Sequence, residues 1–341
     1  MIAVQAFVSV TLLAATAFAA GGDHPYAARG VTSLTNPQVR YTRPEAHFIE
    51  VRRGPITAVI VDNHAVDSPQ CPKHRAGYSG IAVLRHAGRE GNLFLPGVAG
   101  LNFEHIHDGT LAVERELFEP RKARMELRRV SDHVVELYQP PTPNFQLESC
   151  GRYEVLEDGT IEYTFECIPR AKRFAYGYVG LFWASYIDRP ESTATHFRGV
   201  RLADDRSGQA NGWIEARSPE HGVASAHRPV STKDEPLPKH DPRFPLTLVF
   251  NTSNYAYSEP WYYGLSRGMA YVQMFPARSK IWFAQSPTGG GGRNPAWDFE
   301  WFIPDYQVGQ AYGFQMRAAY LPAAGSEALA AKTRAHREAI Q

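Results

Sequence analysis

Two histidines in the segment NFEHIHDG, residues 102–109, have the types and the spacing to take part in chemistry. If this segment is extended, His105 and His107 lie on one face, because side chains alternate along a strand, and Glu104 lies on the other. Two imidazoles at this spacing can converge on one metal ion or exchange protons near neutral pH. No third metal ligand follows at a fixed distance, so a polar cleft, a metal site and a purely structural role all stay open.

The segment WDFEWFI, residues 297–303, carries two carboxylates among large apolar residues. On a strand, Asp298 and Glu300 share one face. The opposite face then carries Trp297, Phe299, Trp301 and Ile303. Four such side chains indicate a surface that packs on a core, so the two acids face solvent or a cleft. Neighbouring carboxylates are the acid/base groups of glycoside chemistry, but the solvated face of a sheet carries acids as well, and both interpretations remain open.

Aromatic residues and arginines gather near the predicted ends of other strands, in the segments GLFWASYIDRP, HFRG and EPWYYG. Aromatic faces and convergent polar groups form many ligand pockets, and an arginine can hold a carboxylate with two hydrogen bonds. The candidates for such roles are Trp183, His196, Arg198, Trp261, Tyr262 and Arg293. Aromatic runs are also ordinary core filling in β-sandwiches, which is the competing interpretation.

The elements that must position these residues are predicted to be strands. From about residue 46 the chain repeats short apolar or alternating segments separated by turns, and 12% of its residues are aromatic. This pattern favours an all-β fold, a large antiparallel β-sandwich, and only the C-terminal segment 326–341 has helical composition. We expect a single domain over residues 20–341. A polar, proline-rich loop is expected near 203–245, with one short strand candidate, GWIEA, inside it.

A hairpin is predicted between two of the three cysteines, in the segment CGRYEVLEDGTIEYTFEC. Asp158-Gly159 is a strong signal for a two-residue turn. Counting outward from that turn places Cys150 directly opposite Cys167, at a separation that suits a cross-strand disulfide. A pair of buried thiols is the alternative.

The first residues form an apolar run that ends in small residues, so we expect residues 1–19 to be a cleaved signal peptide, with a membrane anchor as the alternative. The mature protein would be secreted or periplasmic and would contain no later membrane span. The 36 basic and 35 acidic side chains give a net charge of +1, which does not indicate a basic surface that binds nucleic acid. No Walker loop, nucleophile elbow or dinucleotide fingerprint is present.

Three motifs, LNFEHIHDG, GLFWASYI and GGGGRNPAWDFEWFIPDY, resemble segments shared by a group of uncharacterised secreted bacterial proteins. The strand-rich pattern also resembles, more loosely, the galactose-mutarotase-like supersandwich. That resemblance implies a groove across one sheet, in which a histidine works with a Glu, Asp or Tyr partner on a sugar. Members of this superfamily include sugar epimerases, glycoside hydrolase domains and polysaccharide lyases.

The sequence therefore predicts an exported carbohydrate-active protein, a lyase or hydrolase that acts on an oligosaccharide or polysaccharide, with an acidic glycan as one option. The expected catalytic residues are His105, His107, His196, Tyr262 and Glu300. The expected substrate-binding residues are Trp183, Arg198, Trp261, Arg293 and Asp298. No cofactor is expected, apart from a divalent metal if the two histidines of residues 102–109 bind one. The alternatives are a non-catalytic glycan-binding module and a metal-dependent enzyme centred on those two histidines.

Overall fold

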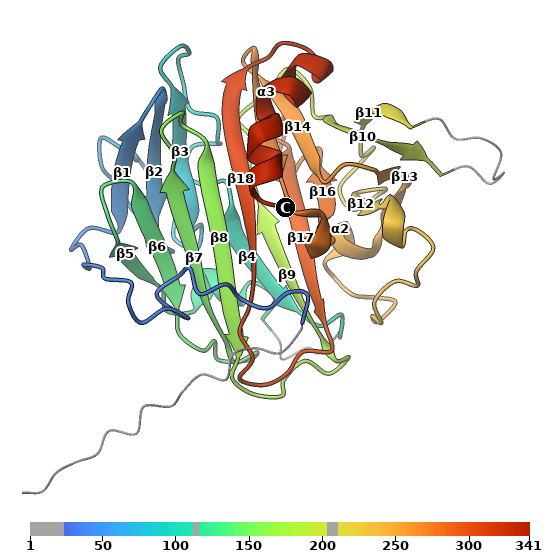
Figure 1. The fold of residues 1–341 in the computed structure, drawn as a ribbon, viewed down its shortest axis with the longest axis horizontal. Coiled ribbons are helices and arrows are strands. Elements are labelled where there is room, and N and C mark those ends of the chain that lie inside the picture. The colour runs from blue at the N-terminus through green and yellow to red at the C-terminus, as the bar shows by residue number, and fades with distance from the viewer. Residues whose placement is uncertain (1–23, 112–115, 203–210) are drawn as a thin grey trace, which may run out of the picture.

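The computed structural model describes residues 24–111, 116–202 and 211–341, and within them the protein is built almost entirely of antiparallel strands (Figure 1). A small sheet contains β1 (Phe48–Arg53), β2 (Ile56–Val61) and β3 (Gly80–His86). The large sheet runs in the order β4 (Asn102–His107), β9 (Tyr178–Ala184), β17 (Ala296–Pro304), β16 (Trp282–Ser286), β12 (Ala226–Pro229), β13 (Thr252–Tyr257), β10 (Thr195–Arg201), β14 (Trp261–Ser266), β15 (Met269–Met274), β18 (Tyr312–Pro322), β8 (Ile161–Pro169), β7 (Leu147–Val155), β6 (Val134–Gln139) and β5 (Glu126–Arg129), and β11 (Gly212–Ala216) pairs with β10. The predicted all-β class is therefore confirmed.

The helices are few and lie outside the sheets. They are α1 (Glu119–Lys122), α2 (Thr247–Phe250), α3 (Ser326–Ala339) and the 3₁₀ turns η1 (Val230–Thr232) and η2 (Ala277–Ser279). The predicted C-terminal helix is α3, which packs Leu329 against the outer side of β14, β15 and β18 (Figure 1). Among the described residues, no helix is long and apolar enough to cross a membrane. The expected signal peptide lies outside the described residues.

The aromatic core lies on one side of strands β9 and β17. Trp297, Phe299, Trp301 and Ile303 are all fully buried there, as the alternation of β17 predicted. Trp183 of β9 stacks on Phe299 with ring centroids 5.0 Å apart. The burial of each such side chain stabilises the fold by roughly 2 kcal/mol or more, so this side of the sheet is fixed by packing.

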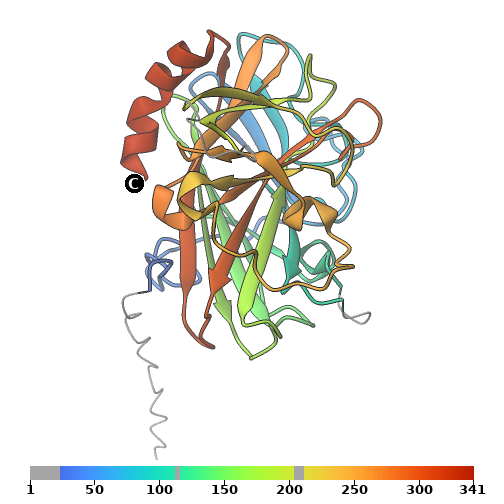
Figure 2. The same ribbon diagram turned by 90° about the vertical axis from the view of Figure 1, so that its right-hand side faces the viewer.

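The other side of β9, β17 and β16 is covered by the chain between β12 and β13. A second apolar cluster there joins Phe182 and Ala296 of the sheet to Phe244 and to α2. Figure 2 shows this yellow and orange part of the chain in front of the strands. The predicted loop at 203–245 is thus only partly a loop, because its described residues include two strands, β11 and β12. The expected short strand is β11, and β12 lies inside the large sheet between β16 and β13.

The predicted disulfide is not formed, because the β7–β8 hairpin has a different register. Thr160 pairs with Leu156, and the turn between them has three residues instead of two, with Gly159 at φ +87°. Cys150 is therefore opposite Glu166, while Cys167 is opposite Ser149, and both buried thiols are free. A shift of one residue moves a side chain to the other face of a sheet, so the two sulfurs point to opposite sides.

Candidate functional site

A bulge in β4 brings an acid and a base to the same side of the large sheet. Phe103 pairs with Trp183 and His105 pairs with Phe182, so Glu104 is an extra residue without a partner on β9. Such a bulge breaks the alternation of side chains locally. Glu104 and His105 consequently line one cavity, whereas the sequence pattern had placed them on opposite faces.

This cavity, which we call the cleft, has a volume of about 370 Å³, within the range of small-molecule sites. Its floor is β4, β17 and Tyr186, which follows β9; one wall is α1, and its cover is the start of α2. The lining residues are Tyr78, Glu104, His105, Leu117, Phe118, Arg121, Tyr186, His221, Pro245, Leu246, Leu248, Gly289, Ala296 and Asp298. Buried titratable groups and aromatic rings therefore occur together in one concavity.

Glu104 is held by two strong hydrogen bonds. The hydroxyl of Tyr186 donates to its Oε1 at 2.6 Å, and Arg121 Nη1 donates to the same oxygen at 3.0 Å. Arg121 also donates from Nε to the carbonyl of Gly77 and lies 3.9 Å over the ring of Tyr78. Burial raises the pKa of Glu104, while the hydrogen bonds from Tyr186 and Arg121 act in the opposite direction.

Asp298 is the second acid of the cleft, and its pKa is raised more strongly than the pKa of Glu104. Its Oδ1 accepts a hydrogen bond from the backbone N–H of Ser185 at 2.9 Å, but its Oδ2 is buried with no hydrogen-bond partner among the described residues. Burial, and then the nearby charge of Glu104, raise the pKa of Asp298 well above its usual range. Asp298 is thus a carboxylic acid with a proton to donate, next to a carboxylate that an arginine stabilises.

His105 supplies a neutral imidazole. Its Nε2 lies 3.7 Å from Glu104 Oε2, and its ring packs on Phe118 with centroids 4.3 Å apart. Burial lowers the pKa of His105 to about 3, so the ring is uncharged at neutral pH and is a weak proton acceptor. Opposite shifts of an acid and a base within one cavity are typical of proton-transfer sites.

His107 and Glu300 form a separate pair that does not line the cleft. His107 Nε2 lies 2.6 Å from Glu300 Oε1, and the two residues are 0% and 1% exposed. Burial lowers the pKa of His107 to about 3 and raises the pKa of Glu300, so a protonated carboxyl donates to a neutral ring. The rings of Phe244 and Phe250 cover the histidine, with centroids 5.1 and 6.1 Å away. The pair is sealed from solvent.

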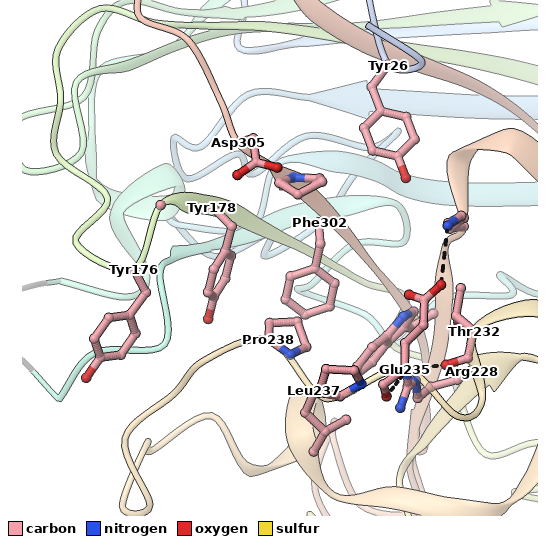
Figure 3. Close-up of a pocket in the computed structure, with 15 residues that line it drawn as sticks. Tyr26, Tyr176, Tyr178, Arg228, Thr232, Glu235, Leu237, Pro238, Phe302 and Asp305 are labelled. Atoms are coloured by element: carbon pink, nitrogen blue, oxygen red, sulfur yellow. Dashed lines mark hydrogen bonds and ion pairs between the residues drawn. The ribbon is translucent and has the colours of Figure 1, made fainter.

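A second cavity of about 380 Å³ lies on the same face of the sheet, beyond that pair (Figure 3). Tyr178 and Phe302 project into it from β9 and β17, and Arg228 reaches it from β12 and donates to the carbonyl of Glu235 at 2.9 Å. Its acids, Glu235 and Asp305, are exposed. The second cavity therefore offers aromatic surface and hydrogen-bonding groups, but no buried acid/base pair.

The structure brings only part of the predicted site together. His105 and Asp298 line the cleft, and Tyr262 supports it from below, because its hydroxyl donates to the backbone carbonyl of Asp298 at 2.8 Å. Trp183 is a core residue, and Arg293 is exposed in the β16–β17 connection.

The remaining predicted residues lie near α3, away from the cleft. His196 stacks on Tyr263 with centroids 4.8 Å apart, Arg198 pairs with Glu327 of α3 at 2.7 Å, and Trp261 is buried beside that helix. The contacts of Arg198 and Trp261 attach α3 to β10 and β14, and the contact of His196 joins β10 to β14.

Sequence reasoning missed the roles of Glu104 and Arg121. Tyr186 was noted only as part of an aromatic run. No local signal marks the bulge that turns Glu104 into the cleft, and Arg121 lies in a short segment without periodicity. Among the described residues, the only three His, Cys, Asp or Glu side chains that could hold one metal lie in another part of the fold, so His105 and His107 have no third ligand at metal distance.

No protein-family model and no curated protein matches the chain. Among solved structures, it is similar to a galactose mutarotase-like protein from Lactobacillus casei, at 8% identity and a TM-score of 0.42, over 80% of this chain and 99% of that one. It is also similar to an aldose epimerase homologue from C. elegans, at 12% identity and a TM-score of 0.44, over 81% and 99% of the chains. An α-N-acetylgalactosaminidase from Bifidobacterium bifidum gives 10% identity and a TM-score of 0.49, over 85% of this chain and 39% of that one.

Galactose mutarotase-like proteins are thus among the structures that the chain resembles, as its strand-rich pattern indicated. The likeness concerns the architecture and assigns no role to any residue. The function is therefore argued below from the geometry of the cleft.

Proposed function

We propose that the chain is a carbohydrate-active enzyme that hydrolyses a glycosidic bond in the cleft. The observation that carries this proposal is a pair of buried acids in one cavity: Asp298, whose Oδ2 has no partner among the described residues, and Glu104, which Arg121 holds at 3.0 Å. Asp298 donates its proton to the leaving oxygen, and Glu104 takes a proton from the attacking water through Oε2, the oxygen that neither Tyr186 nor Arg121 occupies. His105 lies beside this base as an uncharged ring, with Nε2 3.7 Å from Glu104 Oε2.

A sugar suits the shape and the lining of the cleft. Its volume of about 370 Å³ and its aromatic side chains, Tyr78, Phe118 and Tyr186, provide flat surfaces beside polar groups. Hydrolysis is favoured over elimination from an acidic sugar, which needs a cation to neutralise the substrate carboxylate. The guanidinium of Arg121 is already paired with Glu104. We therefore propose a neutral glycan as the substrate.

A matched set of variants tests this proposal on a panel of neutral and acidic oligosaccharides, with new reducing ends and unsaturated products measured separately. Asp298→Asn keeps an oxygen for the N–H of Ser185 but removes the acid, so activity should fall by roughly 10²–10⁴-fold. Asp305→Asn removes an exposed acid at the second cavity and should leave activity unchanged. Full activity of Asp298→Asn, or unsaturated products alone, would contradict the proposed reaction.

The second candidate function is glycan binding without chemistry, and the second cavity favours it. That cavity presents Tyr178, Trp282 and Phe302 to a ligand but holds no buried acid. Binding of a glycan without any turnover, weakened by Trp282→Ala and not by Asp298→Asn, would support this candidate in place of hydrolysis.

We also propose that residues 1–19 direct export, so that the protein meets glycans outside the cytoplasm. Amino-terminal sequencing of the protein recovered from its native cells tests this point. A mature chain that begins near Ala20 supports export with cleavage, and a chain that retains Met1 contradicts it.

A further inference from the structure

Two histidines and an aspartate meet at one end of the small sheet. His47 precedes β1, and Asp62 and His64 follow β2, so the pairing of these two strands brings them together. His47 Nδ1 lies 2.8 Å from Asp62 Oδ2, and His64 Nδ1 lies 3.1 Å from Asp62 Oδ1. The two rings stack with centroids 4.0 Å apart.

This arrangement matches what a transition-metal ion requires of a protein. All three ligand atoms lie within 4.8 Å of one another. In a tetrahedral site with bonds of about 2.0–2.1 Å, two ligand atoms are about 3.3 Å apart. The two separations between histidine and Asp62, 2.8 and 3.1 Å, need to widen only slightly, and no pair of ligand atoms has to approach from more than 4.8 Å. Asp62 is fixed, with a side chain 4% exposed, whereas the side chains of His47 and His64 are 47% and 52% exposed and free to adjust.

We propose that His47, Asp62 and His64 form a site for a divalent transition-metal ion such as Zn²⁺. Two imidazole nitrogens and one carboxylate oxygen are the donors that Zn²⁺ prefers, whereas Mg²⁺ and Ca²⁺ prefer oxygen ligands alone. The exposure of both rings leaves the fourth position open to water. Asp62 is held for this role by the backbone N–H of His64, which donates to its Oδ1 at 2.9 Å.

The metal site is joined to the cleft by the residue between two of its ligands. The side-chain amide of Asn63 donates to the backbone carbonyls of Pro120, Arg121 and Ala123, at 3.3, 3.3 and 2.7 Å. These residues belong to α1 and its C-terminal end, which form one wall of the cleft. A metal bound by Asp62 and His64 would therefore stiffen the turn that positions Arg121.

Metal binding is tested on the full-length protein with Zn²⁺ alone as the probe, independently of any glycan chemistry. After dialysis against micromolar Zn²⁺ and then metal-free buffer, elemental analysis should find one Zn²⁺ per chain, and the Tm should rise relative to an EDTA-treated sample. Both effects should be lost in His47→Ala and in His64→Ala.

The matched control is His86→Ala. His86 belongs to the same small sheet but pairs with Ile56, at the opposite end of β2, so this variant should retain one Zn²⁺ and the Tm shift. The site would be refuted by wild-type protein that retains no Zn²⁺, by His47→Ala and His64→Ala variants that still bind it, or by equal stabilisation with Mg²⁺. Circular dichroism should show that each variant is folded, because the side chains of His47 and His64 are exposed and their removal leaves no cavity in the core.

Discussion

Replacing Asp298 with asparagine should change how the stability of the protein depends on pH. Burial raises the pKa of Asp298 above its usual value of 3.8. An acid whose pKa is raised in the folded state stabilises the fold below its ordinary pKa, and this contribution is lost as the pH rises towards the raised value. Within that window, one proton released on unfolding changes the free energy of unfolding by about 1.4 kcal/mol per pH unit.

The asparagine variant has no charge to bury, so it should lack this loss. Its side-chain oxygen can still accept the hydrogen bond of Ser185, and its amide takes the place of a carboxyl oxygen that already lacks a partner. The difference in free energy of unfolding between variant and wild type should therefore move in favour of the variant by up to about 1.4 kcal/mol per pH unit as the pH rises.

Urea unfolding of both proteins between about pH 5 and pH 8 measures this difference. Asp305→Asn, which changes an exposed acid, should follow the wild-type curve at every pH. Parallel curves for Asp298→Asn and wild type would refute the assignment of a protonated, buried Asp298. They would also remove the proton donor on which the proposed hydrolysis depends.

Three further perturbations follow from the same region. Tyr186→Phe removes the 2.6 Å hydrogen bond to Glu104, and urea unfolding should show a loss of about 1.5–3 kcal/mol. Acid should destabilise the fold, because burial lowers the pKa of His107 from 6.5 to about 3. The contribution of His107 to the free energy of unfolding is complete above about pH 6.5 and is lost as the pH falls towards about 3. His107→Gln should therefore reduce the slope of stability against pH in this window. Gly180→Ala would place a methyl group 2.3 Å from the ring of His107 and should lower the free energy of unfolding by about 1–3 kcal/mol. In the control, Gly212→Ala, the added methyl group meets no atom within 4 Å, so the free energy of unfolding should not change. Equal Tm values for the two variants would contradict this packing.

The alternation of apolar residues was enough to predict the class of fold and the core face of β17. Trp297 and Phe299 lie where period two places them, because burial of large rings decides which face of a strand turns inward. The same pattern indicated that Asp298 and Glu300 share the other face. Their complete burial could not be read from it, because the cover comes from a segment more than 40 residues away in the chain.

Two single-residue irregularities account for the main errors. The bulge at Glu104 moves that side chain to the face of His105, and the three-residue turn at Gly159 moves Cys150 and Cys167 to opposite faces. Each changes the register by one residue, which local sequence specifies weakly. The position of His196 apart from the cleft has a different cause, since its ring stacks on Tyr263, a residue distant in the sequence.

The cover over the buried pair of His107 and Glu300 has a consequence for the length of any ligand. Phe244 and Phe250 lie on this pair, and the chain from 237 to 248 touches the cleft at one end and the second cavity at the other. A polymer that ran along the sheet would have to displace both rings. If a glycan is hydrolysed in the cleft, it must enter by one end, so the first products should be single sugars or very short fragments and not a broad ladder of mid-chain cuts.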